Sequence, residues 1–271
     1  MSFICYNGYL IQQKQLAINT SDEAWRWGHG FFESGRWHQG KWLFAPHHHQ
    51  RIQHTATVLQ FKPLPSPQVL ENYVAETIAA NQLQAGARIR IQFWPDVQNG
   101  LSYCIEATPL STPAFAWKET GANIAVYKHF IKSADAFSNL KLCSYAPYVQ
   151  ARRWAQAQDV AEAILCNSSG RICEGAHSNI FVLLHDTWMT PPLSEGPVAG
   201  VCRSHLLQNA SAQGITVKES MVTLADLKNA QEVILTNAVQ GMVWVQAFGE
   251  SRYHNTGAKK LHTALFEPFT L

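Results

Sequence analysis

Residues 171–181 read Arg-Ile-Cys-Glu-Gly-Ala-His-Ser-Asn-Ile-Phe, and this stretch decides how the chain is interpreted. Its acidic residue, Glu174, follows the turn-forming string Ser168-Ser-Gly170 and precedes a run typical of a β-strand. A lysine, Lys141, stands 33 residues earlier, in the string Asn139-Leu-Lys-Leu-Cys-Ser-Tyr145. Taken singly, a strand-end carboxylate and a lysine are usually solvated surface residues. Their value lies in the chemistry that the two groups could perform together.

A lysine amine can form a Schiff base with an aldehyde cofactor, and a carboxylate can hold a pyridinium nitrogen protonated. Those are the two protein groups that the chemistry of pyridoxal phosphate (PLP) needs most. The lysine must be deprotonated to attack, which a desolvated pocket favours by lowering its pKa. Once released, the same amine could move the substrate's α-proton. We therefore predict a catalytic Lys141 and a cofactor-binding Glu174.

The string Glu-Gly-x-x-Ser-Asn-Ile-Phe closely resembles the signature of the class IV (fold-type IV) PLP enzymes, which include branched-chain and D-amino-acid aminotransferases and 4-amino-4-deoxychorismate lyase. Six more strings resemble family motifs and occur in the family's order: Asn7-Gly8, Trp27–Glu33, His48–Arg51, Thr190-Pro191, Gly200–Arg203 and Thr236–Gly241. Each is weak alone, but the ordered set is specific. The resemblance implies an α+β, two-domain, D-amino-acid aminotransferase-like fold, with PLP between the domains.

A phosphate site is predicted where Gly200 leads into a helix over Val201–Ala212. The free N–H groups of Val201 and Cys202 at its start can point at an anion. By resemblance, Arg51 supplies the fixed positive charge, because a guanidinium fork suits phosphate geometry. Thr236, at the end of a strand, could add a hydroxyl. The alternative for Arg51 is an arginine on a helix surface.

Three positions depart from the family pattern. His29 stands where relatives have Asp, Ser144 where they usually have Asn, and Cys202 where they have Thr or Ser. The exchange at Cys202 removes a hydroxyl contact to phosphate and leaves only the backbone contact. By resemblance to branched-chain aminotransferases, Tyr145 gives a hydroxyl to the phenolic oxygen of PLP.

Substrate contacts are expected from Arg90, by resemblance to the arginine that binds the substrate carboxylate in some aminotransferases. In strand alternation Arg90 shares a face with Arg88, so a solvated strand face is the alternative. Phe32 is expected to line the substrate pocket. Trp94 and Tyr103 could do the same, although core packing is the default for all three aromatics. The family's last loop places Asn237 and Ala238 at the substrate.

The three consecutive histidines, His47 to His49, do not predict a metal site. Neighbouring side chains on a regular element point in different directions, and no cysteine or carboxylate stands at ligand spacing. We expect His48 to pack in the core or to orient Arg51.

Composition limits the partners. The 271 residues carry a net charge of +2, with 46% hydrophobic residues, as in a globular protein with a large core. No basic run predicts nucleic acid or an anionic membrane as a partner, and no apolar run is long enough to span a bilayer. The six scattered cysteines and a start without a leader pattern favour reduced thiols in a cytoplasmic protein.

Periodicity predicts a mixture of helices and strands rather than strict βαβ alternation. A helix should follow the cap Ser66 and Pro67, and strands at Arg88–Trp94 and Tyr103–Ala107 should pair. In the second half we expect strands at Asn123–Tyr127, Ala161–Cys166, Asn179–Leu184, Glu232–Thr236 and Val243–Ala247, and helices at Ala146–Gln158, Val201–Ala212 and Leu224–Asn229. The domain boundary is placed at Ser111–Gly121. This gives a small domain of residues 1–115 and a larger PLP-binding domain of residues 120–271 that carries Lys141.

The leading hypothesis is an aminotransferase that moves an amino group from an amino acid to a 2-oxo acid through a Schiff base on Lys141. The alternative is 4-amino-4-deoxychorismate lyase, which eliminates pyruvate to give 4-aminobenzoate for folate synthesis. The short chain and the string Thr236-Asn-Ala238 fit the lyase, whereas Phe32 in place of Tyr fits branched-chain enzymes. A third hypothesis is a member that binds PLP, or nothing, without turnover. The resemblance also implies a homodimer, and sequence leaves open the preference for L- or D-substrates.

Overall fold

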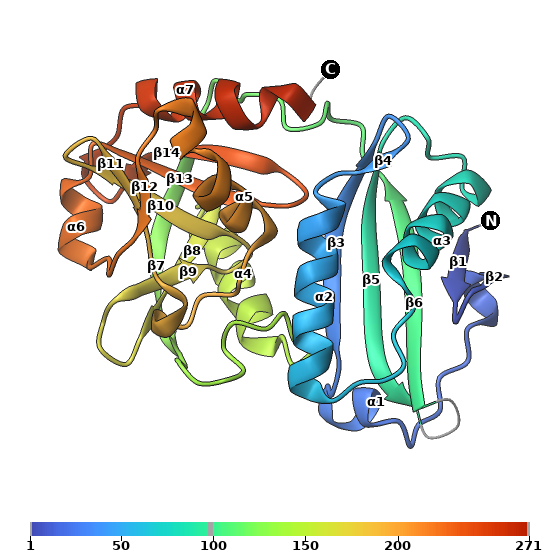
Figure 1. The fold of residues 1–271 in the computed structure, drawn as a ribbon. Coiled ribbons are helices and arrows are strands. Elements are labelled where there is room, and N and C mark those ends of the chain that lie inside the picture. Colours follow the sequence, from blue (N-terminus) through green and yellow to red (C-terminus); the bar gives the residue numbers. More distant parts are fainter. Residues whose placement is uncertain (1, 97–99, 270–271) are drawn as a thin grey trace. The chain divides into compact units, whose positions relative to one another are not determined.

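The computed structural model describes residues 2–96 and 100–269, which form two compact units (Figure 1). Unit 1 comprises the chain up to Ala114 together with Leu140–Tyr145, and unit 2 comprises Phe115–Asn139 and the chain from Ala146 onward. The division after Ala114 falls within the segment where the sequence places the boundary. Lys141 differs from expectation, because it lies in unit 1 and not in the larger second unit.

Unit 1 is built on a sheet of six described strands in the order β2-β1-β6-β5-β3-β4, with every neighbouring pair antiparallel. Its strands are β1 (Phe3–Tyr6), β2 (Tyr9–Gln12), β3 (Phe31–His38), β4 (Lys41–Trp42), β5 (Ala87–Asp96) and β6 (Gly100–Pro109). Its helices are α1 (Glu23–Trp27), α2 (Ala45–Leu59) and α3 (Pro67–Ala80), with a 3₁₀ turn at η1 (Gln13–Gln15).

The local signals of unit 1 are confirmed. Ser66 caps α3 by accepting a hydrogen bond from the Val69 N–H at 3.4 Å, and Pro67 occupies the first helical position. β5 pairs with β6 along its whole length, with Ile91 opposite Ile105. The apolar faces of α2 and α3 pack with the sheet in one core that includes Ile52, Val74 and Ile91. This core makes the sheet a firm support for the side chains on β3 and β5.

The segment that carries Lys141 runs against the start of β3. The Phe32 N–H donates to the Lys141 carbonyl at 2.9 Å, and the Cys143 N–H donates to the Gly30 carbonyl at 2.8 Å. A Cβ on Gly30 would lie 2.6 Å from the Phe93 carbonyl oxygen, so only glycine allows β5 to come this close to residue 30. These main-chain bonds explain why Lys141 belongs to unit 1.

Unit 2 contains a sheet of nine described strands ordered β12-β11-β10-β13-β14-β7-β8-β9, with β15 paired to β14. The strands are β7 (Ala122–Lys132), β8 (Glu162–Asn167), β9 (Ile172–Gly175), β10 (Asn179–Leu184), β11 (Thr187–Thr190), β12 (Val217–Glu219), β13 (Glu232–Asn237), β14 (Gly241–Phe248) and β15 (Ser251–Arg252). The helices are α4 (Ala146–Ala157), α5 (Val201–Asn209), α6 (Leu224–Asn229) and α7 (Thr256–Leu265), with 3₁₀ turns η2 (Leu193–Glu195), η3 (Ser211–Gln213) and η4 (Glu267–Phe269).

The sheet of unit 2 is buried on two faces. One face packs against α4 through Ala163 and Leu165 of β8, and the other packs in a core that includes Ile164. The expected strands and helices of this half are all present, although α5 ends at Asn209, where η3 then follows. Within the described residues, no helix is long and apolar enough to cross a membrane.

Candidate active site

In unit 1, Lys141 lies among aromatic rings. Its Nζ is 4.6 Å from the centroid of the Phe32 ring and 5.7 Å from that of Tyr145. The Phe32 and Tyr145 rings contact each other edge to face at 5.3 Å. Phe32 is buried and Lys141 is half-buried, so the amine stands at the border of an apolar surface. The structure therefore brings together three residues that sequence assigned to one site.

Arg90 joins this group from the neighbouring strand. Its Cζ lies 4.1 Å from the Phe32 ring centroid, and its Nη2 donates to Gln92 Oε1 at 3.0 Å. Arg88, on the same strand face, is exposed, whereas Arg90 is half-buried. Two cations thus contact the single ring of Phe32, from β5 and from the Lys141 segment. The arrangement creates a positive, half-buried surface suited to an anionic ligand.

Arg51 lies on α2 and pairs with Glu33 of β3. Its Nε and Nη2 donate to the two carboxylate oxygens at 2.7 and 2.6 Å, and His48 Nδ1 lies 2.6 Å from the same carboxylate. Burial by itself raises the pKa of Glu33, but the charges and hydrogen bonds of Arg51 and His48 outweigh it and lower the pKa to about 2. His48 therefore does help to orient Arg51, through their shared carboxylate.

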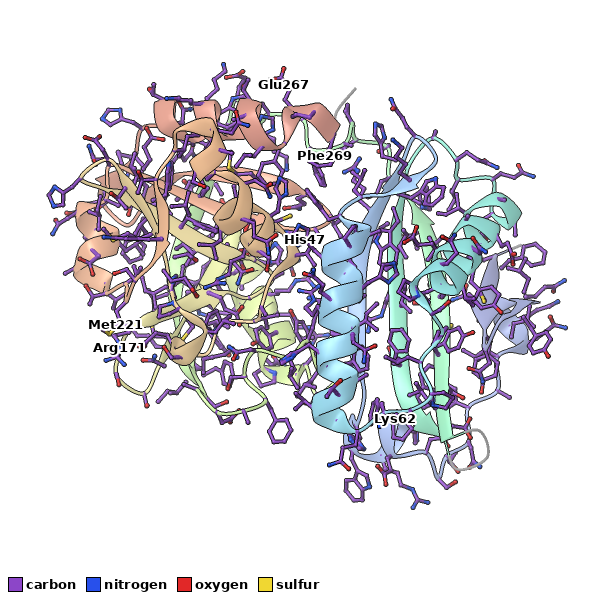
Figure 2. The ribbon with its side chains drawn as sticks, viewed as in Figure 1. His47, Lys62, Arg171, Met221, Glu267 and Phe269 are labelled. Atoms are coloured by element: carbon purple, nitrogen blue, oxygen red, sulfur yellow. The ribbon has the colours of Figure 1, made fainter. Side chains whose placement is uncertain are left out.

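The other two histidines of this run reach separate partners. His49 Nε2 lies 2.8 Å from Glu71 Oε1, and His47, labelled in Figure 2, contacts the ring of Phe44. A guanidinium has five N–H donors, so the pairing of Arg51 with Glu33 does not use them all. The phosphate role predicted for Arg51 stays a prediction, now with a second, structural role beside it.

In unit 2, Glu174 ends β9 as a buried carboxylate with only 3% of its surface exposed. The Tyr148 hydroxyl donates to Oε1 at 2.8 Å, and the Val198 N–H donates to Oε2 at 2.9 Å. Lys132 Nζ lies 3.8 Å from Oε1 and also donates to the Ser138 carbonyl at 2.8 Å. Two hydrogen-bond donors and a nearby lysine thus surround this carboxylate. Sequence reasoning predicted Glu174 but missed Tyr148 and Val198.

The turn that leads into β9 is fixed by Glu195. Arg171, labelled in Figure 2, donates from Nε to Glu195 Oε2 at 2.6 Å, and Asn167 Nδ2 donates to the same oxygen at 2.6 Å. The Arg171 hydrogen bond, against a partial cost of burial, lowers the pKa of Glu195. The Cys173 thiol donates to the Glu195 carbonyl at 3.0 Å. These contacts anchor the residue next to Glu174.

The first turn of α5 lies beside the start of β10. Gly200 is the N-cap of this helix and has no side-chain cap bond, and Val201 and Cys202 follow it as the first two helical residues. N–H groups at these positions have no acceptor within the helix itself. Asn179 Nδ2 donates to the Val198 carbonyl at 2.9 Å, and a Cβ built on Gly200 would lie 1.7 Å from Asn179 Oδ1. Asn179 therefore supports the loop that carries Val198 and leads into the helix. It was not singled out from sequence, although it belongs to the quoted string.

Thr236 is the register partner of Asn179, on β13. It is 1% exposed, and no hydrogen-bond partner for its Oγ1 lies within residues 2–96 and 100–269. A buried hydroxyl without a partner is costly, which is a reason to expect a ligand there. The next residues form a turn in which Asn237 Oδ1 accepts from the N–H groups of Val239 and Gln240 at 3.0 and 2.8 Å. Asn237 thus has a structural role that the sequence did not reveal, and Ala238 beside it is buried.

The three departures from the family pattern have different surroundings. His29 is partly exposed, and its Nδ1 lies 2.5 Å from Glu23 Oε2. Ser144 is exposed, and its backbone would be 3.3 Å from a Cβ on Gly28, whose φ of +67° also requires glycine. Cys202 lies in the first turn of α5, where the sequence placed it, and it is 1% exposed.

Two of the aromatic residues considered for the pocket belong to the core of unit 1. Trp94 stacks on Tyr6 at 6.1 Å, and Tyr103 stacks on Tyr73 at 6.3 Å. Phe32 is the aromatic residue of the three that contacts Lys141.

Residues 30–248 match the family Amino-transferase class IV. The chain belongs to this family. The family and the mixed fold that the sequence predicts are therefore confirmed. Class IV aminotransferases are PLP-dependent enzymes, and this chain is accordingly an enzyme of that class.

This class IV aminotransferase resembles relatives with different reactions. It is 28% identical to a probable branched-chain-amino-acid aminotransferase of Thermotoga maritima, over 71% of this chain and 69% of that protein. It is 22% identical to the aminodeoxychorismate lyase of Bacillus subtilis, over 92% of this chain and 88% of that protein.

Among solved structures, the branched-chain amino acid aminotransferase from Escherichia coli has a TM-score of 0.88 at 21% identity, covering 99% of this chain and 94% of that one. The PLP-bound form of a hypothetical aminotransferase from Mycobacterium tuberculosis has a TM-score of 0.85 at 18% identity, covering 98% and 100%. At these identities the two structures establish the fold alone.

Proposed function

We propose that this class IV enzyme is an aminotransferase that transfers an amino group from an amino acid to a 2-oxo acid, with PLP attached to Lys141. The observation that carries the PLP chemistry of this proposal is the environment of Glu174. Its carboxylate is buried, receives hydrogen bonds from Tyr148 and Val198, and lies near the cation of Lys132. A fixed buried anion of this kind is suited to a protonated ring nitrogen.

The residues of each unit fit PLP. Unit 2 offers the helix start at Val201 and Cys202 for a phosphate, and the unsatisfied Thr236 Oγ1 as a further donor. Unit 1 offers Lys141 at the border of an aromatic surface, with the Tyr145 ring in contact with Phe32. In this proposal the Tyr145 hydroxyl reaches the phenolic oxygen, and Arg51 neutralises the phosphate.

When bound, PLP supplies an electron sink for the electron pair that is released at the substrate Cα. Lys141 Nζ accepts the α-proton and returns it to another carbon, acting as the general base and acid. Tyr148 and Val198 hold the Glu174 carboxylate in place through both proton transfers. The Phe32 and Tyr145 rings cover one side of the amine and limit its contact with water there.

We assign the substrate carboxylate to Arg90, because it is the half-buried cation that contacts Phe32 beside Lys141. The backbone at Asn237 and Ala238 is a second expected contact, and the turn formed by Asn237 Oδ1 holds that backbone in place. Phe32 limits the space available to the substrate side chain. The amino donor and acceptor are small molecules of the amino acid and 2-oxo acid class.

Aminodeoxychorismate lyase is the second candidate. It is favoured by the extent of the match to the Bacillus subtilis lyase, which spans 92% of this chain, and by the string Thr236-Asn-Ala238. The same lysine and carboxylate serve both reactions, so these two residues do not separate them. The two reactions diverge after the α-proton is lost: the aminotransferase reprotonates its intermediate, whereas the lyase expels pyruvate.

A homodimer in the cytoplasm is part of the proposal. The family resemblance supports the dimer. The cytoplasm is supported by the six cysteines, which are unpaired, as is usual in a reducing compartment. Light scattering of the PLP-loaded protein at catalytic concentration measures the assembly, and a monomeric mass rejects the dimer.

A substrate panel tests the function. The purified, PLP-loaded protein is incubated with L- or D-amino acids and 2-oxoglutarate or pyruvate, and separately with aminodeoxychorismate alone. We expect amino transfer to a 2-oxo acid. Pyruvate and 4-aminobenzoate formed from aminodeoxychorismate without an acceptor would instead establish the lyase. Saturation with PLP but no turnover on any member of the panel would favour a binding protein without catalysis.

A further inference from the structure

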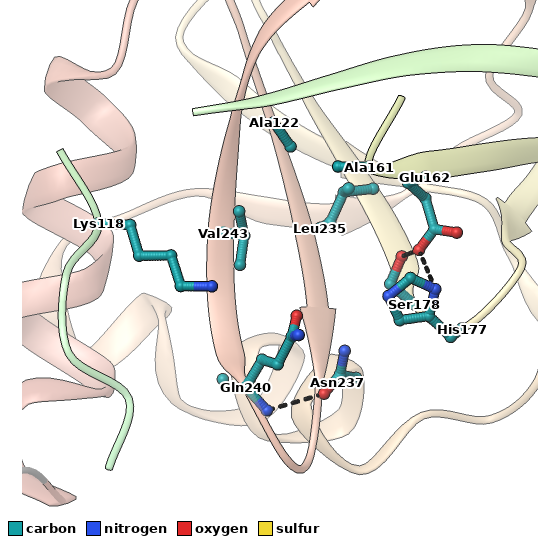
Figure 3. A pocket seen from close by; sticks show the side chains of 11 residues that line it. Lys118, Ala122, Ala161, Glu162, His177, Ser178, Leu235, Asn237, Gln240 and Val243 are labelled. Atoms are coloured by element: carbon teal, nitrogen blue, oxygen red, sulfur yellow. Dashed lines mark hydrogen bonds and ion pairs between the residues drawn. The ribbon is translucent and has the colours of Figure 1, made fainter. Parts of the chain in front are cut away.

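A cavity of about 130 Å³ lies within unit 2, where several strands begin or end (Figure 3). Its lining includes Ala122 at the start of β7, Glu162 at the start of β8, Asn237 at the end of β13 and Gly241 at the start of β14. The space corresponds to about four water molecules at roughly 30 Å³ each. The end of a curved sheet is a common place for a small-molecule site.

One wall of the cavity is a fixed pair of Glu162 and His177. Glu162 is 1% exposed; it accepts hydrogen bonds from Ser178 Oγ at 2.6 Å and from the Ala176 N–H at 3.0 Å. His177 Nδ1 lies 3.0 Å from Glu162 Oε2, although the contact lacks the angle of a good hydrogen bond. The other ring nitrogen of His177 is on the side of the ring toward the remaining lining residues (Figure 3). The imidazole and the carboxylate thus both line this wall, with the carboxylate oxygens held by Ser178 and Ala176.

The opposite wall carries Lys118. Its side chain extends toward Gln240 and Val243 (Figure 3), and its backbone carbonyl is held by Trp244 Nε1 at 2.9 Å. Lys118 makes no ion pair within residues 2–96 and 100–269. Leu235 and Val243 supply apolar surface between the two walls. The cavity therefore has a cation on one side, an imidazole on the other and an apolar floor.

Within unit 2, the Glu162 and Leu235 side chains that line this cavity lie on the opposite sheet face from Glu174 and Thr236. Glu174 pairs with Leu165, and side chains alternate along β8, so Glu162 points to the opposite face of the sheet from Ala163 and Leu165. By the same alternation on β13, Leu235 points away from the face of Thr236. The cavity is thus on the other face of the sheet from Glu174 and Thr236, although it shares Asn237 with the proposed substrate site. Its assignment does not rest on the proposed function.

We propose that this cavity binds a small monocarboxylate with a short apolar chain. Lys118 and His177 supply the positive charge and the donor for the carboxylate, and Leu235 and Val243 contact the chain. A cationic ligand is disfavoured, because Lys118 lines the cavity and the Glu162 charge is already satisfied by its hydrogen bonds. A multiply charged anion is disfavoured by the small volume and because Lys118 is the one lysine among the described lining residues.

Propionate is the test ligand for the full-length, PLP-loaded protein. The protein is labelled at histidine, and the imidazole signal of His177 is assigned by its absence from His177→Gln. Sodium propionate is titrated in place of sodium chloride, so that pH and ionic strength stay constant. The His177 signal should shift with propionate concentration until the site is saturated. Lys118→Gln should weaken the apparent affinity at least tenfold, whereas Lys118→Arg should restore most of it.

Lys228→Gln is the matched control, because it removes an exposed lysine charge on α6, which does not line the cavity. It should leave the affinity unchanged, as should Arg90→Gln in unit 1. The proposal is overturned by a wild-type signal that does not saturate, by equal affinity in Lys118→Gln, by loss of the response in Arg90→Gln, or by tighter binding of propylammonium than of propionate.

Discussion

Arg51 donates from Nε and Nη2 to both carboxylate oxygens of Glu33, at 2.7 and 2.6 Å, and so joins helix α2 to strand β3. His48 completes the group with its Nδ1 2.6 Å from Glu33 Oε2. The Glu33 side chain is 1% exposed, so this charge depends on its two partners. A residue that sequence assigned to cofactor binding is therefore also part of the buried framework of unit 1.

The first prediction concerns acid stability. The folded pKa of Glu33 is lowered from 4.5 to about 2, so the stabilisation by this carboxylate is present above the unfolded value and is lost as pH falls from about 4.5 toward about 2. Glu33→Gln should be less stable than wild type at neutral pH by about 3–5 kcal/mol, as expected when a buried pair loses one partner. Urea unfolding across this pH range should show the difference shrinking with acid. A constant difference would contradict the shifted pKa.

The second prediction separates the two roles of Arg51. Arg51→Ala alone leaves Glu33 buried without its guanidinium, so a loss of PLP binding could reflect misfolding. In Arg51→Ala/Glu33→Gln the uncompensated charge is removed as well. If Arg51 contacts phosphate, this double variant should still bind PLP more weakly than Glu33→Gln by about 1.5–3 kcal/mol, typical of a hydrogen bond to a charged group. Equal PLP affinity of the two variants, measured by titration of the apoprotein, would place the phosphate elsewhere.

The third prediction identifies the lysine that carries the cofactor. Borohydride treatment of the PLP-loaded protein should fix the cofactor to Lys141, and a peptide map should place the adduct there. Lys132 is the informative competitor, because it is buried and its Nζ lies 3.8 Å from Glu174 Oε1. Lys141→Ala should abolish the adduct, whereas Lys132→Met should retain it. A map that places the adduct on Lys132 rejects the assignment.

Several elements could be predicted from local sequence. The cap Ser66 with Pro67 predicts the start of α3, and the alternation at Arg88–Trp94 predicts β5, because both signals lie within a few residues. The position of Lys141 could not be predicted in the same way. It depends on backbone bonds to Gly30 and Phe32, which are more than a hundred residues away in the chain.

The site shows the same limit. Lys141 and Glu174 belong to recognisable strings, but Tyr148 and Lys132 reach Glu174 only because α4 and β7 pack beside β8 and β9. Asn237 was expected at the substrate from its string alone. That role stays a prediction. The Asn237 oxygen also closes a turn, and the string alone did not predict this contact, because such a turn has more than one possible geometry.

The fourth prediction separates electron withdrawal from cofactor binding. Glu174→Gln keeps the shape of the side chain but removes its negative charge, so PLP should still bind. Loss of the α-proton should slow by orders of magnitude, with each tenfold loss equal to roughly 1.4 kcal/mol of barrier. Tyr148→Phe is the graded comparison, because it removes one hydrogen bond to Glu174, worth about 1.5–3 kcal/mol when an ion is involved. Single-turnover rates measure both, and a normal rate in Glu174→Gln excludes the assigned role.

The last prediction tests the loop that carries Val198 and leads through Gly200 into α5. A Cβ on Gly200 would lie 1.7 Å from Asn179 Oδ1, so Gly200→Ala must displace either the Asn179 side chain or the start of the helix. Displacement moves the Val201 and Cys202 N–H groups and should weaken PLP binding. In Gly200→Ala/Asn179→Ala the clash is removed together with the hydrogen bond from Asn179 to Val198. The two changes should therefore be non-additive in thermal stability, with the double variant less destabilised than the sum of the single ones. Additive losses, or wild-type PLP affinity in Gly200→Ala, would show that this contact does not position the helix start.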